Sequence, residues 1–376
     1  MTNIGKKSVN TTIANKYLLC IVSTPPPTGG ASIMNQNTIN ILRDNKYHVI
    51  HINPKYAKKA SDREKASFTK LFELIRIFCN VIFYCAFYKI DKVYYGLSSN
   101  INAFLKDFII LSIPILFKKK IIIHLHLSNL IEFYYQGDAV IQKMMRFIIR
   151  KATLFLVLSE NLKNKFQEII PAEKMAVVVN GIMPPKPNII SLKNKDKLIC
   201  LFLGILIKSK GYDVVIEAAK YITDKDVIFY IAGPPGKDYD EHEMDQYIKN
   251  NGLAEKVFLV GPQYGDAKEE IYAKSDIFIF PTVFGPEAFP LVLLEAMSHG
   301  LCIITSRTGA ISEIIEEGFN GYLLNDIDSR EIANKIDYLN NHRQTIREIS
   351  SNNLTTFNEK YSIEQYESNI LKIFGS

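Results

Sequence analysis

The sequence predicts an α/β protein made of two doubly wound domains, each with a parallel sheet covered by helices. Three observations support this prediction. Short apolar, β-prone runs alternate with helical segments along most of the chain. A length of 376 residues suits two domains better than one. A proline-rich, charged stretch from residue 184 to 197 interrupts the alternation, and we expect it to be the linker.

The composition is that of an ordinary globular protein, with 47% hydrophobic residues, 22% charged residues and a net charge of +6. The five cysteines show no metal or redox spacing, and most lie in apolar runs, so we expect buried, reduced thiols and a cytoplasmic location. The first sixteen residues are polar and are expected to be a loose leader without a signal peptide. The apolar run 108–117 is about half a membrane span. The positive charge accompanies no nucleic-acid motif, and it suits weak attraction to an anionic membrane surface.

The first predicted domain covers residues 1–188. Its expected strands lie at 17–23, 49–52, 92–95, 120–125, 154–158 and 175–179. A long, very apolar helix is expected at 68–89, and another at 104–117. The aromatic stripe of the first helix predicts packing in a core, and a membrane-facing surface is the alternative.

The second predicted domain covers residues 189–360. Its expected strands lie at 198–203, 227–232, 256–260, 276–280 and 301–305. Helices are expected at 212–221, 291–299, 332–340 and 343–360. The last segment, 361–376, is expected to be a helix that packs back on the first domain.

The stretch 276–300 carries the most specific pattern. A strand, a turn and a helix that starts at Pro290 hold two carboxylates, Glu287 in the loop and Glu295 inside the helix. A carboxylate among apolar helix residues is costly unless something hydrogen-bonds it, and a pair of sugar hydroxyls would do so. Glu287 lies just before a helix N-terminus, whose free N–H groups suit a phosphate. The alternative is that Glu287 is a solvated acid in a loop and that Glu295 is a partly exposed helix residue.

The pattern E-A-F-P-L-V-L-L-E-A-M-S-H-G resembles the E-x7-E element of retaining glycosyltransferases with the GT-B fold, the family called GT4. The resemblance implies that Glu295 binds the nucleotide ribose and that Glu287 faces the transferred sugar. It also implies that the backbone of Phe289, Pro290 and Leu291 receives the diphosphate.

Other positions carry the resemblance through the chain. Gly29 and Gly30 match the loop that lies near the donor phosphate, and His126, rather than His124, matches the histidine that contacts the donor sugar. Lys210 matches the family's lysine at the diphosphate.

One position departs from the family pattern. Ile205 stands where an arginine usually helps to neutralise the diphosphate, and Lys208 is the candidate to compensate for it.

The implied protein has two Rossmann-like domains facing a central cleft. Its expected activity is retaining transfer of a hexose from a nucleotide-diphosphate sugar, a UDP-sugar by preference, to a glycan or lipid-linked acceptor. Bacterial surface polysaccharide (capsule, O-antigen or lipopolysaccharide) is the expected product. We expect no metal, on the premise that the chain lacks an Asp-x-Asp motif, and no other cofactor. Peripheral contact with the anionic inner membrane is a further expectation.

Two other functions stay open on the sequence. A non-catalytic subunit that binds a nucleotide sugar within a polysaccharide assembly complex is supported by Ile205. A sugar-nucleotide epimerase with the same fold is disfavoured, because such enzymes lack the E-x7-E pattern. Detection of sugar transfer or donor hydrolysis separates the three.

Overall fold

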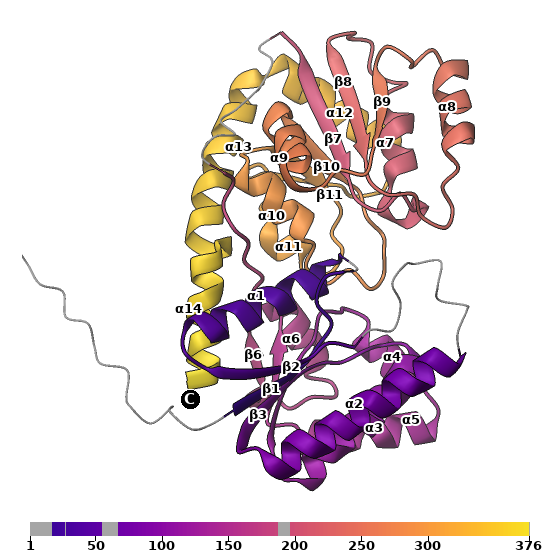
Figure 1. Cartoon of the computed structure of the whole chain (residues 1–376). Coiled ribbons are helices and arrows are strands. Elements are labelled where there is room, and N and C mark those ends of the chain that lie inside the picture. Colours follow the sequence, from indigo (N-terminus) through magenta and orange to yellow (C-terminus); the bar gives the residue numbers. More distant parts are fainter. Residues whose placement is uncertain (1–16, 27, 55–66, 187–195, 376) are drawn as a thin grey trace, which may run out of the picture. The chain divides into compact units, whose positions relative to one another are not determined.

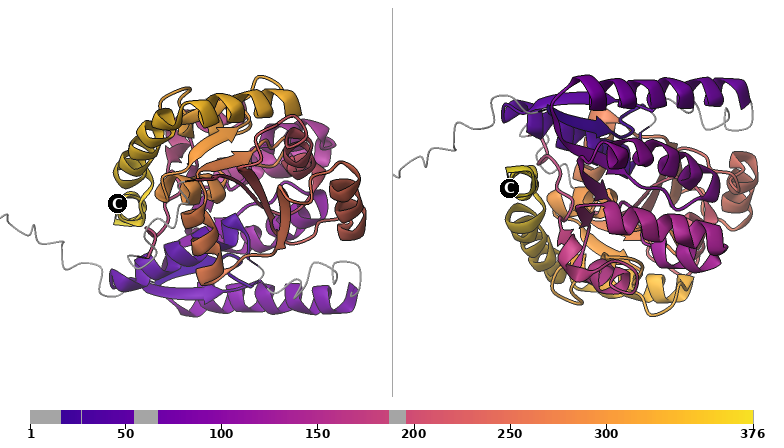
Figure 2. Two further views of the ribbon diagram at one scale, coloured as in Figure 1. Left: turned by 90° about the horizontal axis from the view of Figure 1, so that it is seen from above. Right: turned by 90° about the horizontal axis from the view of Figure 1, so that it is seen from below.

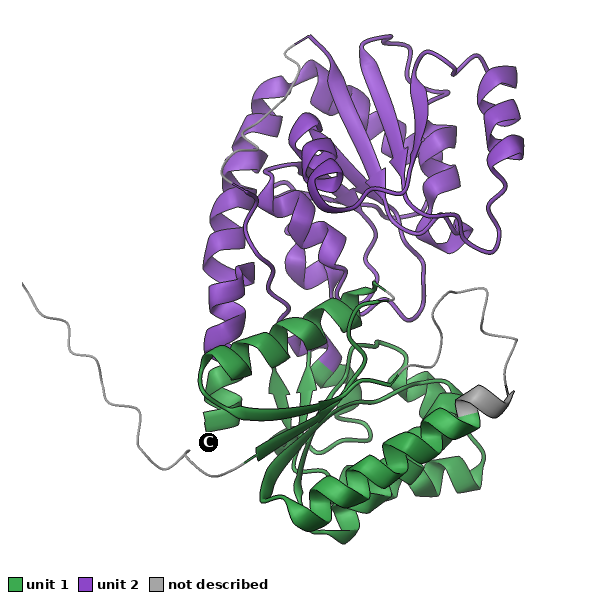
Figure 3. Cartoon of the chain, in the orientation of Figure 1, with its two compact units in different colours: residues 1–157, 163–177, 370–376 green, residues 158–162, 178–369 purple. Residues whose placement is uncertain are grey.

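A computed structural model describes residues 17–26, 28–54, 67–186 and 196–375. The predicted leader and the predicted domain boundary at 188–189 lie outside these residues. The chain forms two compact units (Figure 3): the first contains residues up to 157, 163–177 and 370–376, and the second contains 158–162 and 178–369.

The first unit is built on a six-stranded parallel sheet of order β2-β1-β3-β4-β5-β6 (Figure 1). The strands are β1 (Tyr17–Ile21), β2 (His48–Ile52), β3 (Ile90–Gly96), β4 (Lys120–His124), β5 (Leu154–Val157) and β6 (Met175–Val177). The helices that follow these strands are α1 (Gly30–Asp44), α2 (Ser67–Phe87), α3 (Ile101–Leu116), α4 (Leu130–Gln136), α5 (Ala139–Lys151) and α6 (Glu160–Phe166). Figure 1 shows α1 on one side of the sheet and α2, α3 and α5 on the other.

The second unit has a parallel sheet of order β12-β11-β10-β7-β8-β9. Its strands are β7 (Leu198–Leu203), β8 (Val227–Ala232), β9 (Val257–Gly261), β10 (Ile277–Phe280), β11 (Cys302–Thr305) and β12 (Gly321–Leu323). Its longer helices are α7 (Tyr212–Ala218), α8 (Glu241–Asn250), α9 (Gly265–Lys274), α10 (Leu291–Ser298), α12 (Ser329–Asn341) and α13 (Arg343–Thr356). A four-residue α11 (Ile311–Ile314) precedes β12, and α14 (Ile363–Gly375) ends the chain.

The strand order places two loops of the second unit side by side. The chain runs outward from β7 to β9 and then returns to β10 on the other side of β7. The loops after β7 and β10 therefore leave the same edge of the sheet at its topological switch point, where open α/β sheets bind ligands. The backbone N–H of Val283 donates to the carbonyl of Ser209 at 2.8 Å and joins the two loops.

The fold class predicted from the sequence is confirmed: both sheets are parallel and both alternate with helices. Every predicted strand is present. The central residues of the inner strands β1, β3, β4, β7, β10 and β11 are apolar and buried, as in strands covered on both faces, whereas β2, β6 and β9 are only partly buried. The elements α4, α5, α6, α8, α9, α11 and β12 were not predicted from the sequence. Most of them are short or polar, but α5 has 13 residues and buries Ile141, Met145 and Ile148 at helical spacing, so its pattern was available and was missed.

Two predictions about burial are corrected by the structure. Cys79 is exposed, whereas the other four cysteines are buried. The aromatic stripe of α2 is only partly a core: Ile77 and Val81 are fully buried, but Phe72 and Phe87 are 72% and 76% exposed. The helix therefore has two apolar faces, and one of them meets solvent.

Candidate functional site

The two loops at the switch point of the second unit bring Lys210 and Glu287 together. Lys210 ends a short 3-10 turn, Lys208–Lys210, after β7, and Glu287 lies in the loop after β10. Lys210 Nζ lies 2.7 Å from Glu287 Oε2, and the two side chains are only 16% and 14% exposed. The ammonium also lies over the ring of Phe280, 5.2 Å from its centroid. A ligand at this edge would therefore meet a paired, largely buried cation and carboxylate.

The loop that carries Glu287 is held by its backbone. The ring of Phe289 is buried, and its carbonyl accepts a hydrogen bond from the buried Asn180 at 3.3 Å. The N–H of Ala310 donates to the carbonyl of Ala288 at 3.0 Å. Gly309 has φ of +59°, and a Cβ there would stand 2.4 Å from the carbonyl oxygen of Glu287. A glycine is therefore needed for the next loop to approach this closely.

Helix α10 starts at Leu291, as the predicted range 291–299 has it, although Pro290 was expected to be the first helical position. Pro290 has an extended backbone and is the N-cap, so the first helical residue is Leu291. The first N–H groups of a helix have no hydrogen-bond partner within the helix and point outward at its N-terminal end. The side chains of Phe289, Pro290 and Leu291 are buried, which leaves the backbone N–H groups of Phe289 and Leu291 as possible donors to a ligand, since proline has no N–H. The helix ends at Ser298, and Gly300 follows with φ of +64°.

Glu295 is not the lone carboxylate that the sequence suggested. Its Oε1 lies 2.5 Å from Lys268 Nζ, and its Oε2 accepts a hydrogen bond from Tyr272 Oη at 3.0 Å. Burial and the neighbouring Glu295 carboxylate raise the pKa of Tyr272 well above its usual value, so the phenol stays a donor. The cost of placing a carboxylate in an apolar helix is therefore met within the protein, and sugar hydroxyls would add to or replace these contacts.

Lys268 was not predicted from the sequence to belong to the site. This residue and Tyr272 lie four positions apart on α9 and so share one face of that helix. The pattern was available in the sequence, but no helix was assigned there. Without the tertiary structure, nothing linked this helix to Glu295, which is 27 residues away in the chain.

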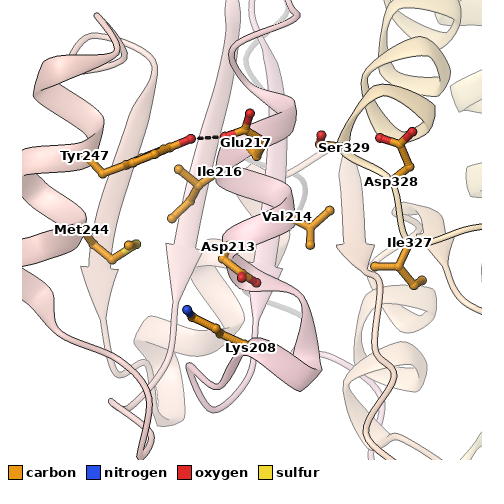
Figure 4. A pocket seen from close by; sticks show the side chains of 10 residues that line it. All are labelled: Lys208, Asp213, Val214, Ile216, Glu217, Met244, Tyr247, Ile327, Asp328 and Ser329. Carbon is orange, nitrogen blue, oxygen red and sulfur yellow. Dashed lines mark hydrogen bonds between the residues drawn. The ribbon is translucent and has the colours of Figure 1, made fainter.

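The side chains of Lys208 and Lys210 have different surroundings, although both residues lie in one turn. Lys208 lines a pocket between α7, α8 and the start of α12 (Figure 4), together with Asp213. Across this pocket Tyr247 hydrogen-bonds Glu217, and none of the predicted binding residues other than Lys208 lines it. Ile205, in the position of the family's arginine, is 48% exposed.

The premise behind the expected metal independence was wrong. The sequence contains three Asp-x-Asp triplets, at residues 224–226, 238–240 and 326–328. Asp240 and Asp328 cap the N-termini of α8 and α12, and Asp224 closes a turn by accepting the N–H of Asp226. Among the residues that the structure describes, no group of three or more His, Cys, Asp or Glu side chains could hold a metal ion.

In the first unit, Gly29 and Gly30 start α1 after β1. The Ser32 hydroxyl donates to the carbonyl of Gly29 and accepts from its N–H, each at 2.9 Å. Gly29 is exposed and has an extended backbone with φ of −159°, and a Cβ there would meet only Ser32 Oγ, 3.9 Å away. The fold of this loop does not require a glycine, which leaves close approach of a ligand as a reason for one.

The two histidines after β4 lie against each other, with ring centroids 3.9 Å apart. His124 Nδ1 lies 2.7 Å from Tyr94 Oη, which in turn donates to Asn35 Oδ1 at 3.1 Å. Both ring nitrogens of His126 are buried without a hydrogen-bond partner in the described part of the chain. Burial lowers the pKa of His126 to about 4 and that of His124 well below its usual value, so both rings are neutral near pH 7.

Residues 187–355 match the family model described as "Glycosyl transferases group 1". The chain is 30% identical over 183 residues to the uncharacterized glycosyltransferase MJ1607 of Methanocaldococcus jannaschii, covering 44% of this chain and 45% of that protein. It is 32% identical over 181 residues to spore coat protein SA of Bacillus subtilis, covering 46% and 45%. It is 30% identical over 171 residues to the amylovoran biosynthesis glycosyltransferase AmsK of Erwinia amylovora, covering 43% and 41%. These matches span less than half the length of each relative.

Solved structures extend the similarity to nearly the whole chain. Anabaena Alr3699/HepE, solved in complex with UDP, superposes with a TM-score of 0.72 at 19% identity, over 96% of this chain and 99% of that one. The sucrose-phosphate synthase of Thermosynechococcus elongatus superposes with a TM-score of 0.77 at 16% identity, over 96% and 98%. The predicted GT-B fold, with two Rossmann-like units, is thereby confirmed.

Proposed function

Because residues 187–355 place this chain among the group 1 glycosyltransferases, we propose that it transfers a sugar from a nucleotide-diphosphate donor with retention of configuration. The observation that carries the proposal is the pair of lysine–glutamate contacts beside α10. Lys210 pairs with Glu287 before the helix, and Lys268 pairs with Glu295 inside it. The helix N-terminus lies between the two carboxylates in sequence.

The arrangement suits a donor with two phosphates and two sugars. A leaving nucleotide diphosphate gains negative charge as the glycosidic bond breaks. The free N–H groups at the start of α10 and the ammonium of Lys210 would stabilise that charge. Glu295 would accept hydrogen bonds from the ribose hydroxyls and Glu287 from the transferred sugar. A hydrogen bond from a hydroxyl group to an ionised carboxylate is stronger than one between neutral groups, and it would fix the orientation of the sugar.

We assign the remaining predicted residues by the family resemblance. His126 is neutral near pH 7, and its unpartnered ring nitrogens are available to a sugar hydroxyl. Gly29 and Gly30 are exposed at the start of α1 and would admit a phosphate or an acceptor close to the backbone. The leaving phosphate would take the proton of the acceptor hydroxyl, on the face from which it departs.

In this proposal, the base of the donor nucleotide is uracil, and the product is a bacterial surface polysaccharide. Support for UDP comes from the HepE structure, which contains it, and support for the product comes from the similarity to AmsK. The acceptor is then a glycan or a lipid-linked glycan on the cytoplasmic side of the membrane.

A panel of nucleotide sugars tests the function directly. Thermal unfolding should shift upward with the correct donor, because a ligand that binds only the folded protein stabilises it by mass action. Transfer is then measured by mass spectrometry with candidate acceptors, and the anomeric configuration of the product by NMR. An inverted product would contradict the retaining mechanism, and the absence of binding by any nucleotide sugar would contradict the function.

A non-catalytic donor-binding subunit is the second candidate, and Ile205 is the observation that favours it. Without the arginine, the leaving diphosphate is neutralised less completely. A stable complex with a donor, with neither transfer nor donor hydrolysis for any acceptor in the panel, would support this function over the first.

A further inference from the structure

Helix α2 presents a second apolar stripe to solvent. Its buried face is formed by Ile77, Val81 and Cys85, four residues apart. The opposite face repeats with the same helical spacing and is also apolar, although a solvent-facing stripe is normally polar. Its exposed members are Leu71, Phe72, Ile75, Phe78, Ile82, Phe83 and Phe87.

Helix α3 continues this surface. It packs beside α2 in the first unit, and both lie on the same side of the sheet (Figures 1 and 2). Its exposed apolar residues repeat at four-residue spacing at Ile101, Leu105 and Ile109, and Leu116 is 79% exposed at its end. We call the exposed apolar residues of α2 and α3 together the apolar helix face. Apolar surfaces of this extent are uncommon on soluble monomers and mark an interaction site.

The segment that carries this face is basic. Residues 71–151 contain eleven Lys and Arg against five Asp and Glu, which equals the net charge of +6 of the whole chain. Lys89 follows α2, and Lys118, Lys119 and Lys120 follow α3. Helix α5, which packs beside α3, contains four basic residues and no acidic one. One residue of each sign in this count is buried: Asp107 accepts hydrogen bonds from Tyr95 and Ser98, and Lys92 donates to the carbonyl of Phe374 at 2.8 Å.

We propose that the apolar helix face docks the first unit onto an anionic lipid bilayer, with Phe72, Phe87 and Leu116 inserted at the headgroup boundary and the flanking lysines against the lipid phosphates. The proposal does not depend on the transferase function. It rests on the combination of apolar stripes with a one-sided basic surround, which is the composition of helices that lie in a membrane interface. None of the described helices is long and apolar enough to cross a bilayer, so the face would lie on the membrane.

A membrane is favoured over a second copy of the chain by charge. Pairing two copies through this face would bring two surfaces with the same excess of lysine and arginine together, which costs free energy at the rim of the contact. An anionic bilayer offers an apolar interior and opposite charge at once. The apolar and the basic parts of the surface then act together, as in other two-signal membrane contacts.

The test is flotation of the full chain with vesicles of phosphatidylcholine alone or mixed with phosphatidylglycerol. The unmodified protein should bind the mixed vesicles, and added salt should weaken the binding. The variant Phe72→Ser/Phe87→Ser/Leu116→Ser should lose more than about tenfold in the partition coefficient, because each exposed side chain would bury apolar area in the bilayer. These three residues are the most exposed of the face, so the fold should not depend on them.

Two further variants test separately the contribution of the apolar residues and that of the lysines. Phe258→Ser/Phe319→Ser/Leu354→Ser changes three exposed apolar residues of the second unit and should leave binding unchanged. Lys89→Gln/Lys120→Gln/Lys143→Gln should weaken binding to the mixed vesicles only. The proposal is overturned if the unmodified protein binds neither vesicle, or if both apolar variants bind equally. It is also overturned if light scattering shows a dimer that the apolar variant of the first unit abolishes.

Discussion

Lys268 Nζ lies 2.5 Å from Glu295 Oε1, so the glutamate that the sequence assigns to the nucleotide ribose already has a cationic partner. Both side chains are largely buried, at 24% and 16% exposure, and Tyr272 holds the second carboxylate oxygen. The pair is electrically neutral, and either partner alone would leave an uncompensated, largely buried charge at α10.

Lys268→Met should therefore weaken binding of the nucleotide diphosphate by about tenfold, which is about 1.4 kcal/mol. The physical reason is that an unpaired Glu295 carboxylate would repel an anionic ligand. Calorimetry with UDP measures the effect. Lys274→Met is the matched control, since that lysine lies on the same helix and pairs with the exposed Glu270. Unchanged or tighter binding by Lys268→Met would show that the lysine only competes with the ribose.

Glu287→Gln should spare affinity for the bare nucleotide and lower turnover by about tenfold or more. Its proposed partner is the transferred sugar, which the bare nucleotide lacks. The change also frees Lys210 from its ion pair, so the fold is checked by thermal unfolding. If the variant no longer binds UDP, the roles of Glu287 and Glu295 have been assigned the wrong way round.

Lys210→Ala should lower the transfer rate at saturating donor by more than about tenfold, because its ammonium faces the proposed diphosphate site. Lys208→Ala should have a smaller effect, since Lys208 lines the separate pocket of Figure 4. The sequence alone suggested that Lys208 compensates for Ile205. A loss by Lys208→Ala that equals that of Lys210→Ala, with rescue by Ile205→Arg, would restore that hypothesis.

Transfer should continue in the presence of EDTA. The helix N-terminus and lysines supply the positive charge in the proposed mechanism, and no metal takes part in it. The initial rate is compared before chelation, after chelation and after addition of magnesium or manganese. If chelation abolishes activity and either ion restores it, the metal-free mechanism is wrong. The Asp-x-Asp triplet at 238–240 would then be the first candidate for a metal site.

The stability of the first unit should decrease as the pH falls from about 6.5 to about 4. His126 has a pKa of about 4 in the folded protein, below its ordinary value of 6.5, so the unfolded chain binds a proton that the folded chain excludes. The contribution is complete above pH 6.5 and amounts to about 3 kcal/mol. Denaturant unfolding of the protein and of His126→Gln at several pH values measures it. Parallel pH profiles for the two proteins would contradict the assignment.

The sequence by itself determined the class of the fold and the identity of the central motif. Apolar strands of four to six residues can only be buried on both faces, and their alternation with helices requires parallel sheets. The turn, proline and glycine around Glu287 and Glu295 place both residues in one strand–loop–helix unit. These are local consequences of residue order, and the bounds of β7 and β8 match their predicted limits.

Only the tertiary structure decided which residues meet. Lys210 and Glu287 are 77 residues apart and touch because the strand order returns β10 to the side of β7. Lys268 reaches Glu295 because α9 packs near α10, in a segment whose polar sequence gave no clear helix signal. The exposure of the second face of α2 was likewise undecidable from its pattern. A helix with apolar residues on all sides is predicted to be buried. The sequence pattern shows which side chains are apolar, but it does not show which other elements cover them.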